Sequence, residues 1–385
     1  MIFTRRYSAQ PESGIPEGTP NHNNATIFAT LLLPLVSVLL FVIIGELGLR
    51  FYHLWQWNLS MVDGQFRTTL NRGRPLVLDD QLGWRATENY RFEGTKLSSD
   101  GTEYRATVSQ NENGFRMFGD VSSTKRRVFV IGDSFTQAVA ASDDKTYYAV
   151  VKQLLDLEVF AYGAGGYGSL QEFMILDKYF DMIKPDLILW QFSTNDFVNN
   201  SPEMETASRI NNNGMVRPYL WNNQIQSILP KPYSKKIRLF ALQYCRFCYT
   251  ILTRLDRLDA VKPLKTVETE TFIGGPSHSM FIDSLRVTDA IMERVRKRAG
   301  PIPIFAFVVG TGAPYGPEYE EGLIEISRHH KIVLLDDIDR TVLTAEKAGV
   351  IARAEDGSHW NEVGHRIAGE AIANSLRSAK ALGSR

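Results

Sequence analysis

One stretch of eight residues, Val128 to Phe135, limits what this chain can fold into more than any other. It joins the apolar run Val128–Ile131 directly to Gly-Asp-Ser at positions 132–134. A short apolar run that ends at a Gly-Asp turn predicts a strand buried on both faces of a parallel sheet. The next residues can begin a helix, which would place Ser134 at the carboxyl end of a strand, where open α/β sheets build their sites. Ser134 is then either a nucleophile or only the N-cap of that helix.

Composition narrows the class of protein without deciding its function. At 385 residues the chain can bury a large core in one or two domains. Its 43 basic and 43 acidic residues balance, so no global field favours nucleic acid as a partner. The only two cysteines, Cys245 and Cys248, have the spacing of a redox or half-zinc motif. Zinc would need two more ligands nearby, so we predict two packed helix thiols and leave their redox state open.

The N-terminal part of the chain predicts a membrane anchor. Residues 1–24 are rich in Pro, Gly, Asn and Glu, and we expect a disordered tail there. Residues 25–47 are interpreted as one transmembrane helix, because their apolar part would be about 31 Å long, close to the hydrocarbon thickness of a bilayer. No convincing cleavage site marks a secretory signal, and a buried helix of a soluble protein is the alternative.

Charge constrains the membrane orientation only weakly. Arg5 and Arg6 precede the anchor and favour an inside N-terminus, but Arg50 follows it. Because a large domain follows a single span, we predict that this domain lies outside the cytoplasm, on the periplasmic or cell-surface side.

Residues 48–126 lack clean periodicity, and we interpret them as a juxtamembrane connecting segment packed against the main domain. Trp55 and Trp57 follow the anchor and are expected at the membrane interface. Turns between short strands are expected at 82–85 and 113–116, where glycines lie beside aromatic residues.

Residues 127–385 alternate between strand-like and helix-like stretches, which predicts parallel strands with helices on both faces. We therefore expect an α/β/α three-layer sandwich with a five-stranded parallel sheet. The predicted strands are Arg127–Ile131, Glu158–Ala161, Leu187–Phe192, Ile302–Phe307 and Lys331–Leu335.

An insertion at about 197–301 separates the third and fourth predicted strands. Its first part is loop-like, and helices are expected at 235–258 and 279–298. A small basic cluster in the insertion is either a solvated helix start or a contact with an anionic lipid or polymer. That cluster consists of Lys235, Lys236 and Arg238.

Polar residues that could carry chemistry follow the ends of the predicted strands, where a parallel sheet would bring them to one edge. A serine hydroxyl is a poor nucleophile until a base takes its proton, and His359 can do so near neutral pH. Asp356 can accept from the other ring nitrogen and fix the tautomer. Attack on an ester carbonyl develops an oxyanion, to which the N–H groups of Ser134 and Gly166 and the side chain of Asn195 can donate.

In this arrangement the chain resembles the SGNH/GDSL hydrolase superfamily over roughly residues 127–380. The four blocks of that family supply a serine, a glycine, an asparagine and a histidine, in this order. Here they read Gly132-Asp133-Ser134-Phe135, Gly163-Ala164-Gly165-Gly166-Tyr167-Gly168, Ser193-Thr194-Asn195-Asp196 and Asp356-Gly357-Ser358-His359. The resemblance implies a catalytic Ser134, His359 and Asp356, with Ser134, Gly166 and Asn195 at the oxyanion.

The chain departs from the family pattern at three positions. Phe135 stands where the name-giving motif has leucine, Ser193 where many members have glycine, and Ala161 where asparagine is frequent. The change at Ser193 bears on the approach to the oxyanion site. None of the three removes a catalytic side chain.

The resemblance implies a serine-dependent esterase that works through an acyl-enzyme and needs no metal or organic cofactor. The anchored layout and long insertion are similar to bacterial envelope members, which implies acyl esters, such as O-acetyl groups, on an envelope or extracellular glycan. Two alternatives stay open. An O-acyltransferase would use the same triad on a polysaccharide, and a non-catalytic glycan-binding or assembly component would only retain the fold.

Two rival motifs are weaker. Gly163, Gly165 and Gly168 fit a dinucleotide-binding pattern, but the acid near the required spacing, Asp186, precedes the next predicted strand and lies at the wrong end. Residues 337–341 resemble the first motif of haloacid-dehalogenase-like phosphatases, but too little chain follows for that fold. We interpret them as a charged turn that caps a helix. No GxSxG supports an α/β-hydrolase elbow.

The remaining histidines have no evident partners in the sequence. We interpret His278, His329 and His330 as surface residues. His365 lies about one helical turn after His359, is expected to pack at a helix start, and is the fallback base.

Overall fold

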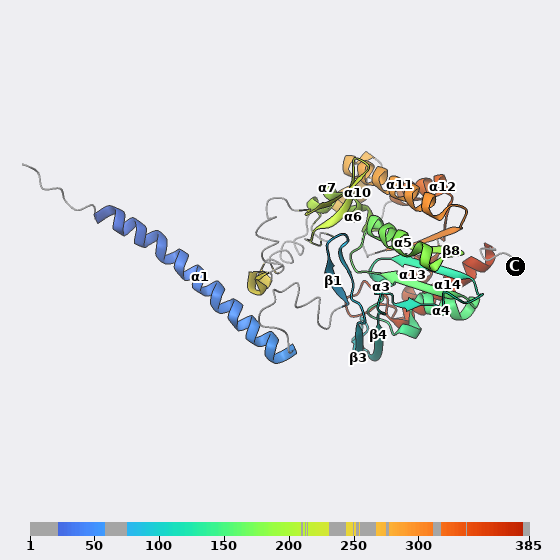
Figure 1. Ribbon diagram of the computed structural model, residues 1–385, viewed down its shortest axis with the longest axis horizontal. Helices are drawn as coiled ribbons and strands as arrows, with labels where there is room; N and C mark the ends of the chain where they lie inside the picture. Colours follow the sequence, from blue (N-terminus) through green and yellow to red (C-terminus); the bar gives the residue numbers. More distant parts are fainter. Residues whose placement is uncertain are drawn as a thin grey trace, which may run out of the picture.

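The computed structural model covers most of the chain, and Figure 1 shows an α/β body from which one long helix extends. The residues it describes are 22–57, 75–208, 211, 213, 215–230, 244–248, 250–251, 254, 267–274, 277–310, 317–335 and 337–379.

The centre of the body is a six-stranded sheet in the order β12-β11-β8-β6-β7-β5. Its five parallel strands are β6 (Arg127–Gly132), β7 (Glu158–Gly163), β8 (Leu187–Ser193), β11 (Ile304–Val309) and β12 (Ile332–Leu334). Strand β6, which ends just before Ser134, lies between β7 and β8 in the middle of the sheet. The first of the five parallel strands in chain order therefore lies in the middle of the sheet.

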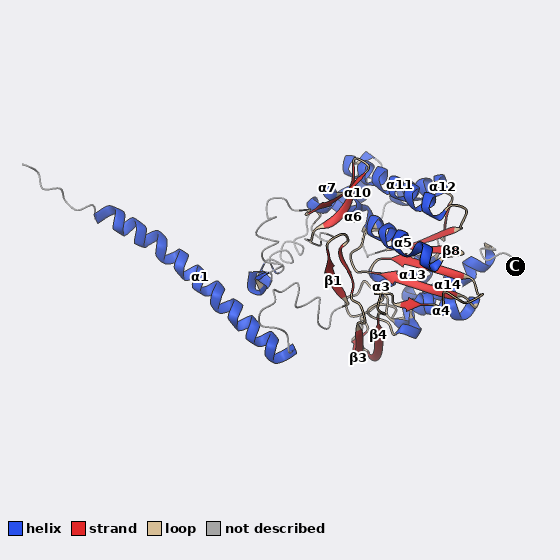
Figure 2. Ribbon diagram, viewed as in Figure 1, coloured by secondary structure: helices blue, strands red, loops and turns tan. Residues whose placement is uncertain are grey.

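Helices cover both faces of this sheet, as Figure 2 shows. Phe129 and Ile131 face one layer, while Val128 and Val130 face the other, because successive strand residues point to opposite sides. The first layer holds α5 (Ser169–Ile183), α11 (Ser279–Ala299) and α12 (Pro317–His329). The second holds α4 (Tyr147–Leu155), α13 (Ile338–Lys347) and α14 (Glu362–Ser378). The predicted three-layer α/β/α class is confirmed.

The prediction of a five-stranded, purely parallel sheet is wrong by one strand. Strand β5 (Met117–Phe118) pairs antiparallel with β7 at the edge, where Met117 lies opposite Ala161. The Arg116 N–H also donates to the carbonyl of Ala161, at 2.9 Å. Two residues are too few to show a strand pattern, and this pair lies in the segment that we interpreted as a connection.

Residues 75–118 form two hairpins that pack against the body. Strand β1 (Leu76–Asp79) pairs with β2 (Gly83–Ala86), and β3 (Arg91–Leu97) pairs with β4 (Glu103–Ser109). The expected turn at 82–85 is therefore largely the strand β2. Its Trp84 is only 1% exposed, so this hairpin belongs to the core of the body.

Between β8 and α11 the chain forms short elements. These are α6 (Asp196–Asn200), α7 (Pro202–Ala207), β9 (Arg217–Trp221), β10 (Gln224–Ile228) and α10 (Val267–Gly274). The expected helix at 279–298 is α11. Of the expected helix 235–258, only residues within 244–254 are described, and most of these are helical. The basic cluster at 235, 236 and 238 lies outside the described residues.

Cys245 and Cys248 form a disulfide, so the prediction of two packed helix thiols is wrong, and the redox state that the sequence left open is the oxidised one. The disulfide lies beside α1 (His22–Trp57). There the ring of Phe247 contacts Phe41, and the backbone N–H of Phe247 donates to Glu46. This turn sits against α1 because Gly45 leaves room for the Phe247 ring: a Cβ there would be 2.6 Å from it.

Helix α1 is longer than the predicted anchor and begins at His22, inside the expected tail. Its stretch Leu32–Trp55 is long and apolar enough to cross a membrane, and none of its most apolar window is buried in the protein. Residues 1–21 of the tail lie outside the described part of the chain.

Candidate active site

Ser134 lies where the central strand turns into a helix. It is the first residue of α3 (Ser134–Gln137), and the cap is Asp133, whose carboxylate accepts from the Phe135 N–H at 3.0 Å. The interpretation of Ser134 as an N-cap is therefore wrong, and its hydroxyl is available for another partner. That partner is His359, whose Nε2 lies 2.8 Å from Ser134 Oγ.

The loop before α14 holds His359 in place. The ring Nδ1 of His359 lies 2.5 Å from Asp356 Oδ2. Asp356 Oδ1 accepts hydrogen bonds from the backbone N–H groups of Ser358 and His359, each at 2.9 Å. Gly357 has a φ of +71°, which favours glycine and lets the loop turn within three residues. Asp356 thus fixes both the backbone and the ring orientation of His359.

Asp356 and His359 also shift each other's pKa. Burial lowers the pKa of His359, but the hydrogen bond and charge of Asp356 outweigh it, so the pKa ends above its ordinary value. Burial likewise raises the pKa of Asp356, but its hydrogen bond to His359 and the charge of His359 bring it well below its usual range. Asp356 is therefore ionised at neutral pH, which holds the proton of the ring on Nδ1 and leaves Nε2 free to accept from serine.

The predicted oxyanion donors lie on the loops that follow β6, β7 and β8. A Cβ added at Gly165 would be 3.8 Å from the Cβ of Ser134, so the glycine-rich loop lies beside the serine. Among the described residues, the N–H groups of Ser134 and Gly166 have no hydrogen-bond partner. Both can therefore donate to a ligand.

Asn195 is more buried than Ser134 and Gly166, which carry the two backbone N–H groups. It is 8% exposed, its Oδ1 accepts from the Ser193 hydroxyl at 2.5 Å, and its Nδ2 donates to Asn199 Oδ1 at 2.9 Å. One hydrogen of the amide is thus used within the protein, and no described residue accepts the second. Ser193 is part of this arrangement.

A small cavity of about 130 Å³ opens beside the serine and histidine. Its walls are mostly apolar: Phe135, Ala138, Val139, Ala140 and Trp360 line it with Ser134, Asp356, His359 and His365. It can hold only a small group.

His365 does not serve as the fallback base. It is 1% exposed and stacked on the ring of Tyr147, whose N–H points at its Nδ1. Burial lowers the pKa of His365 to about 3, so it stays neutral and packs at the start of α14. The sequence already allowed that structural role.

Other predicted candidates fall outside this site. Residues 337–341 form the start of α13, as predicted, but the side chain of Asp337 at the N-cap position makes no capping hydrogen bond to a described residue. The prediction of His330 as a surface residue is wrong: it is 7% exposed, and its Nε2 lies 2.7 Å from Asp289. Asp289, His329 and His330 form the one cluster of possible metal ligands among the described residues. Their ligand atoms lie within 4.8 Å of one another.

Sequence reasoning missed the residues that support the glycine-rich loop. Trp84 donates its indole N–H to the carbonyl of Gly165, at 2.9 Å. Arg217 donates to the carbonyl of Gly166, at 2.5 Å, and pairs with the buried Glu205. The Leu-Gly-Trp-Arg stretch at 82–85 was a visible signal, but it predicted only a turn.

No protein-family model matches the chain, and no curated protein matches it. Among solved structures it is similar to a lipolytic protein of the G-D-S-L family from Veillonella parvula DSM 2008. The identity is 10% and the TM-score 0.37, over 66% of this chain and 98% of that one.

Two further similar structures are enzymes by their names. One is a salicylyl-acyltransferase from a tetracycline biosynthetic pathway, with 16% identity, a TM-score of 0.39, and 69% and 58% of the two chains covered. The other is an acetyl xylan esterase, with 12% identity, a TM-score of 0.36, and 65% and 99% covered. At these identities the function of this chain has to follow from the atoms of its own site.

Proposed function

We propose that this protein is a serine-dependent esterase that works through an acyl-enzyme. The observation that carries the proposal is the unbroken chain from Ser134 Oγ to His359 Nε2, at 2.8 Å, and from His359 Nδ1 to Asp356, at 2.5 Å. Both distances lie within reach for proton transfer. A serine with a base, and a base with an orienting carboxylate, is the arrangement that activates a hydroxyl for attack.

The reaction runs in two halves. Ser134 Oγ attacks the ester carbonyl carbon while His359 takes the hydroxyl proton, and His359 then gives that proton to the departing alcohol as its C–O bond breaks. Water next attacks the acyl-enzyme and loses a proton to His359. The serine–acyl bond breaks, the serine recovers that proton, and a carboxylic acid leaves.

The negative charge that develops on the carbonyl oxygen needs donors that are already in place. The N–H groups of Ser134 and Gly166 fit this role because no described residue accepts from either. Asn195 is the third proposed donor, through the amide hydrogen that it does not give to Asn199. Removing one such donor typically lowers kcat about 10²- to 10³-fold.

The cavity of about 130 Å³ beside Ser134 supports a short acyl group, such as acetyl. The alcohol part of the ester is proposed to be a glycan of the cell envelope or exterior. Helix α1 is proposed to cross the membrane once and to hold the enzyme domain outside the cytoplasm. The domain division also stays a proposal: tail 1–24, anchor 25–47, connecting segment 48–126, and hydrolase-like domain 127–385 with its insertion.

A fluorophosphonate probe tests the proposed nucleophile directly. Incubated with the full chain in detergent, it should form a Ser134 Oγ–phosphorus bond with loss of fluoride. Intact-mass measurement and peptide mapping locate the adduct. Labelling should disappear in Ser134→Ala and fall strongly in His359→Ala. An adduct on a different serine would refute the assignment.

A second measurement separates hydrolysis from transfer. p-Nitrophenyl esters of increasing chain length should show a sharp preference for acetate over longer acyl groups. An O-acetylated polysaccharide, with an unacetylated one as acceptor, then shows whether acetate is released to water or moved to a sugar hydroxyl. Transfer without release would favour the O-acyltransferase.

A further inference from the structure

The proposed oxyanion donor at Gly166 belongs to a peptide unit that a distant tryptophan holds. The N–H of Gly166 and the carbonyl of Gly165 are parts of one planar, trans peptide, so they point in opposite directions. That carbonyl accepts the indole N–H of Trp84 at 2.9 Å. The orientation of the donor is therefore set by what holds the carbonyl.

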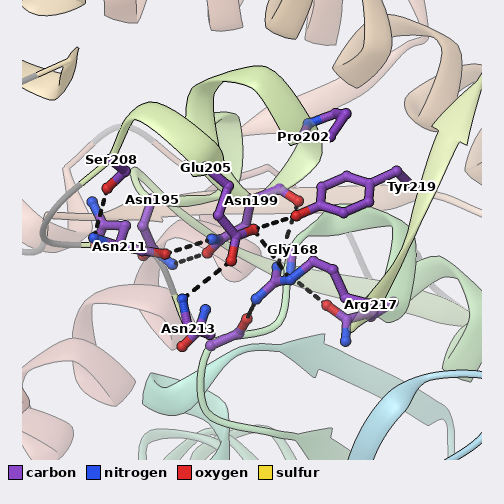
Figure 3. A network of polar contacts seen from close by, with 12 residues as sticks. Gly168, Asn195, Asn199, Pro202, Glu205, Ser208, Asn211, Asn213, Arg217 and Tyr219 are labelled. Carbon is purple, nitrogen blue, oxygen red and sulfur yellow. Dashed lines mark hydrogen bonds and ion pairs between the residues drawn. The ribbon is translucent and has the colours of Figure 1, made fainter. Parts of the chain in front are cut away.

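The next peptide is held from the other side. Arg217 donates from Nη2 to the carbonyl of Gly166, at 2.5 Å, and its guanidinium lies 4.7 Å above the ring of Trp84. Glu205 lies 3.2 Å from Arg217 Nε, and both side chains are fully buried. Figure 3 shows Arg217 between the carboxylate of Glu205 and the loop that ends at Gly168.

This support is needed because the loop is rich in glycine. Gly166 has a φ of +74°, and glycines have the greatest freedom of all residues to leave a given conformation. Without outside contacts the peptide at 165–166 could rotate and turn its N–H away from the site. A donor stabilises a transition state best when it needs no reorganisation.

The two strands that carry these side chains lie in close contact. Trp84 lies on β2 and Arg217 on β9. A Cβ at Gly83 would collide with the carbonyl oxygen of Val216, so only glycine allows this approach. Tyr167 also donates its hydroxyl to the carbonyl of Trp84, at 2.8 Å, which ties the same loop to β2.

We propose that Trp84 and Arg217 are positioning residues that aim the Gly166 N–H at the oxyanion. This inference rests on the proposed esterase function of Ser134. It assigns a catalytic purpose to two segments outside the four sequence blocks: the hairpin of the connecting segment and the hairpin of the insertion.

The same scaffold reaches the second proposed donor. Asn199 accepts from the Asn195 amide at 2.9 Å, and its own carbonyl lies 3.5 Å from Arg217 Nη1. Figure 3 shows Asn195 and Asn199 beside the pair of Glu205 and Arg217. One buried ion pair therefore supports both donors outside the serine itself.

The decisive variant is Trp84→Phe in the full chain in detergent, because it removes the indole N–H and keeps an aromatic ring. With p-nitrophenyl acetate we expect kcat to fall about tenfold while KM changes less than about twofold, a smaller loss than that of a whole donor. Hydrogen exchange of peptides covering 163–168 should accelerate, whereas exchange of peptides covering 356–359 should not change.

Arg217→Lys is the second variant, since it keeps the charge but loses the fork that reaches the carbonyl. Its matched control is Arg298→Lys, at another arginine that lies over a ring, 4.3 Å from Phe180, and pairs with aspartates on α5. We expect about a tenfold loss of kcat in the first and none in the second.

The outcomes separate this inference from the proposed function. If wild type hydrolyses the ester, Ser134→Ala does not, and Trp84→Phe matches wild type in kcat, the positioning role is wrong. If wild type does not hydrolyse esters, the proposed function is wrong. The hydrogen exchange measurement then still decides whether Trp84 holds the loop, and unchanged exchange at 163–168 would overturn the inference.

Discussion

The two sides of the site are built in opposite ways. On the side of the proposed nucleophile Ser134, here called the nucleophile side, His359 and Asp356 are partly open to solvent, with 36% and 51% of their side chains exposed, and they lie three residues apart on one loop. On the side of the proposed oxyanion donors, here called the oxyanion side, the supporting Arg217 and Glu205 are fully buried. Their contacts join segments that are far apart in the chain.

This difference separates chemistry from stability. A partly exposed triad can be changed without leaving a buried group unpaired, so its variants should lose activity and remain folded. The buried support of the oxyanion loop is part of the core, so its variants should lose both.

Ser134→Ala should abolish activity and leave the fold intact. Without the nucleophile we expect kcat to fall on the order of 10⁴-fold or more, since the remaining donors and binding supply only a residual rate. The melting temperature should stay near that of wild type, because the hydroxyl is only partly buried. Ester hydrolysis and thermal unfolding of the full chain in detergent measure the two effects. Substantial residual turnover would exclude the acyl-enzyme route.

Gly166→Ala should lower the activity more than the addition of one methyl group would suggest. The new Cβ would lie 2.7 Å from Asn213 Oδ1, on a residue with a φ of +74°. We expect the loop to shift and kcat to fall about 10²- to 10³-fold, as on loss of one donor.

The matched control is Gly101→Ala, in the turn between β3 and β4. It has a φ of +85° but nothing within 4 Å of the added Cβ, so it imposes similar backbone strain away from the site. Both variants should lose stability by about 1–2 kcal/mol, and only Gly166→Ala should lose activity. Equal activity of the two would show that Gly166 is not a donor.

The geometry of the nucleophile side could be predicted because the residues that meet there lie in short local patterns of the sequence. The apolar run Val128–Ile131 predicts a buried strand, and Ser134 follows it after a Gly-Asp turn. Asp356 and His359 form a unit within four residues. The alternation of strand-like and helix-like stretches similarly predicted the three layers, while the two-residue strand at Met117 was too short to show a pattern.

The oxyanion support was not predictable because it depends on pairing across the chain. Trp84 and Gly165 are 81 residues apart, and Arg217 and Gly166 are 51 apart. Neither Trp84 nor Arg217 lies in a motif, and a single sequence does not reveal which carbonyl a donor reaches. Tertiary contacts of the same kind bury His330 against Asp289, which the sequence left as a surface residue.

Glu205→Gln should destabilise the protein more strongly than the removal of any surface charge. Burial raises the pKa of Glu205, and the charge of Arg217 opposes that rise, so the two groups depend on each other. Removing the carboxylate leaves the guanidinium buried without a counter-ion, which typically costs about 3–5 kcal/mol. Chemical denaturation of the full chain in detergent measures the change in the free energy of unfolding.

Asp177→Asn is the control, because the pair of Asp177 with Arg298 is partly exposed to solvent and Arg298 keeps Asp181 as a second partner, so the loss should be less than about 1 kcal/mol. If both variants lose the same small amount, the ion pair on the oxyanion side is not a structural support. If Glu205→Gln also lowers kcat, the loop and the core are coupled as the contacts indicate.

The smallest expected effect is in the pH dependence. His359 must be neutral to accept the serine proton, and its pKa is raised by Asp356, so kcat/KM should rise with pH through a value above about 6.5. In Asp356→Asn the burial of His359 dominates, and this limb should move to lower pH while the overall rate falls. A pH–rate profile of both proteins measures the shift, and an unmoved limb would mean that another group titrates.

Asp356 and His359 should also make the stability of the fold depend on pH. The contribution of His359 to stability falls as the pH rises, whereas the activity increases. Because the folded pKa of His359 is raised, its contribution is complete below about pH 6.5 and is lost as the pH rises through the folded value. Because that of Asp356 is lowered, its contribution is present above about pH 3.9 and is lost as the pH falls through the folded value. Wild type should therefore lose a little stability from mildly acidic to alkaline pH. Asp356→Asn should not, since the exposed half of this site is held together by that one charge.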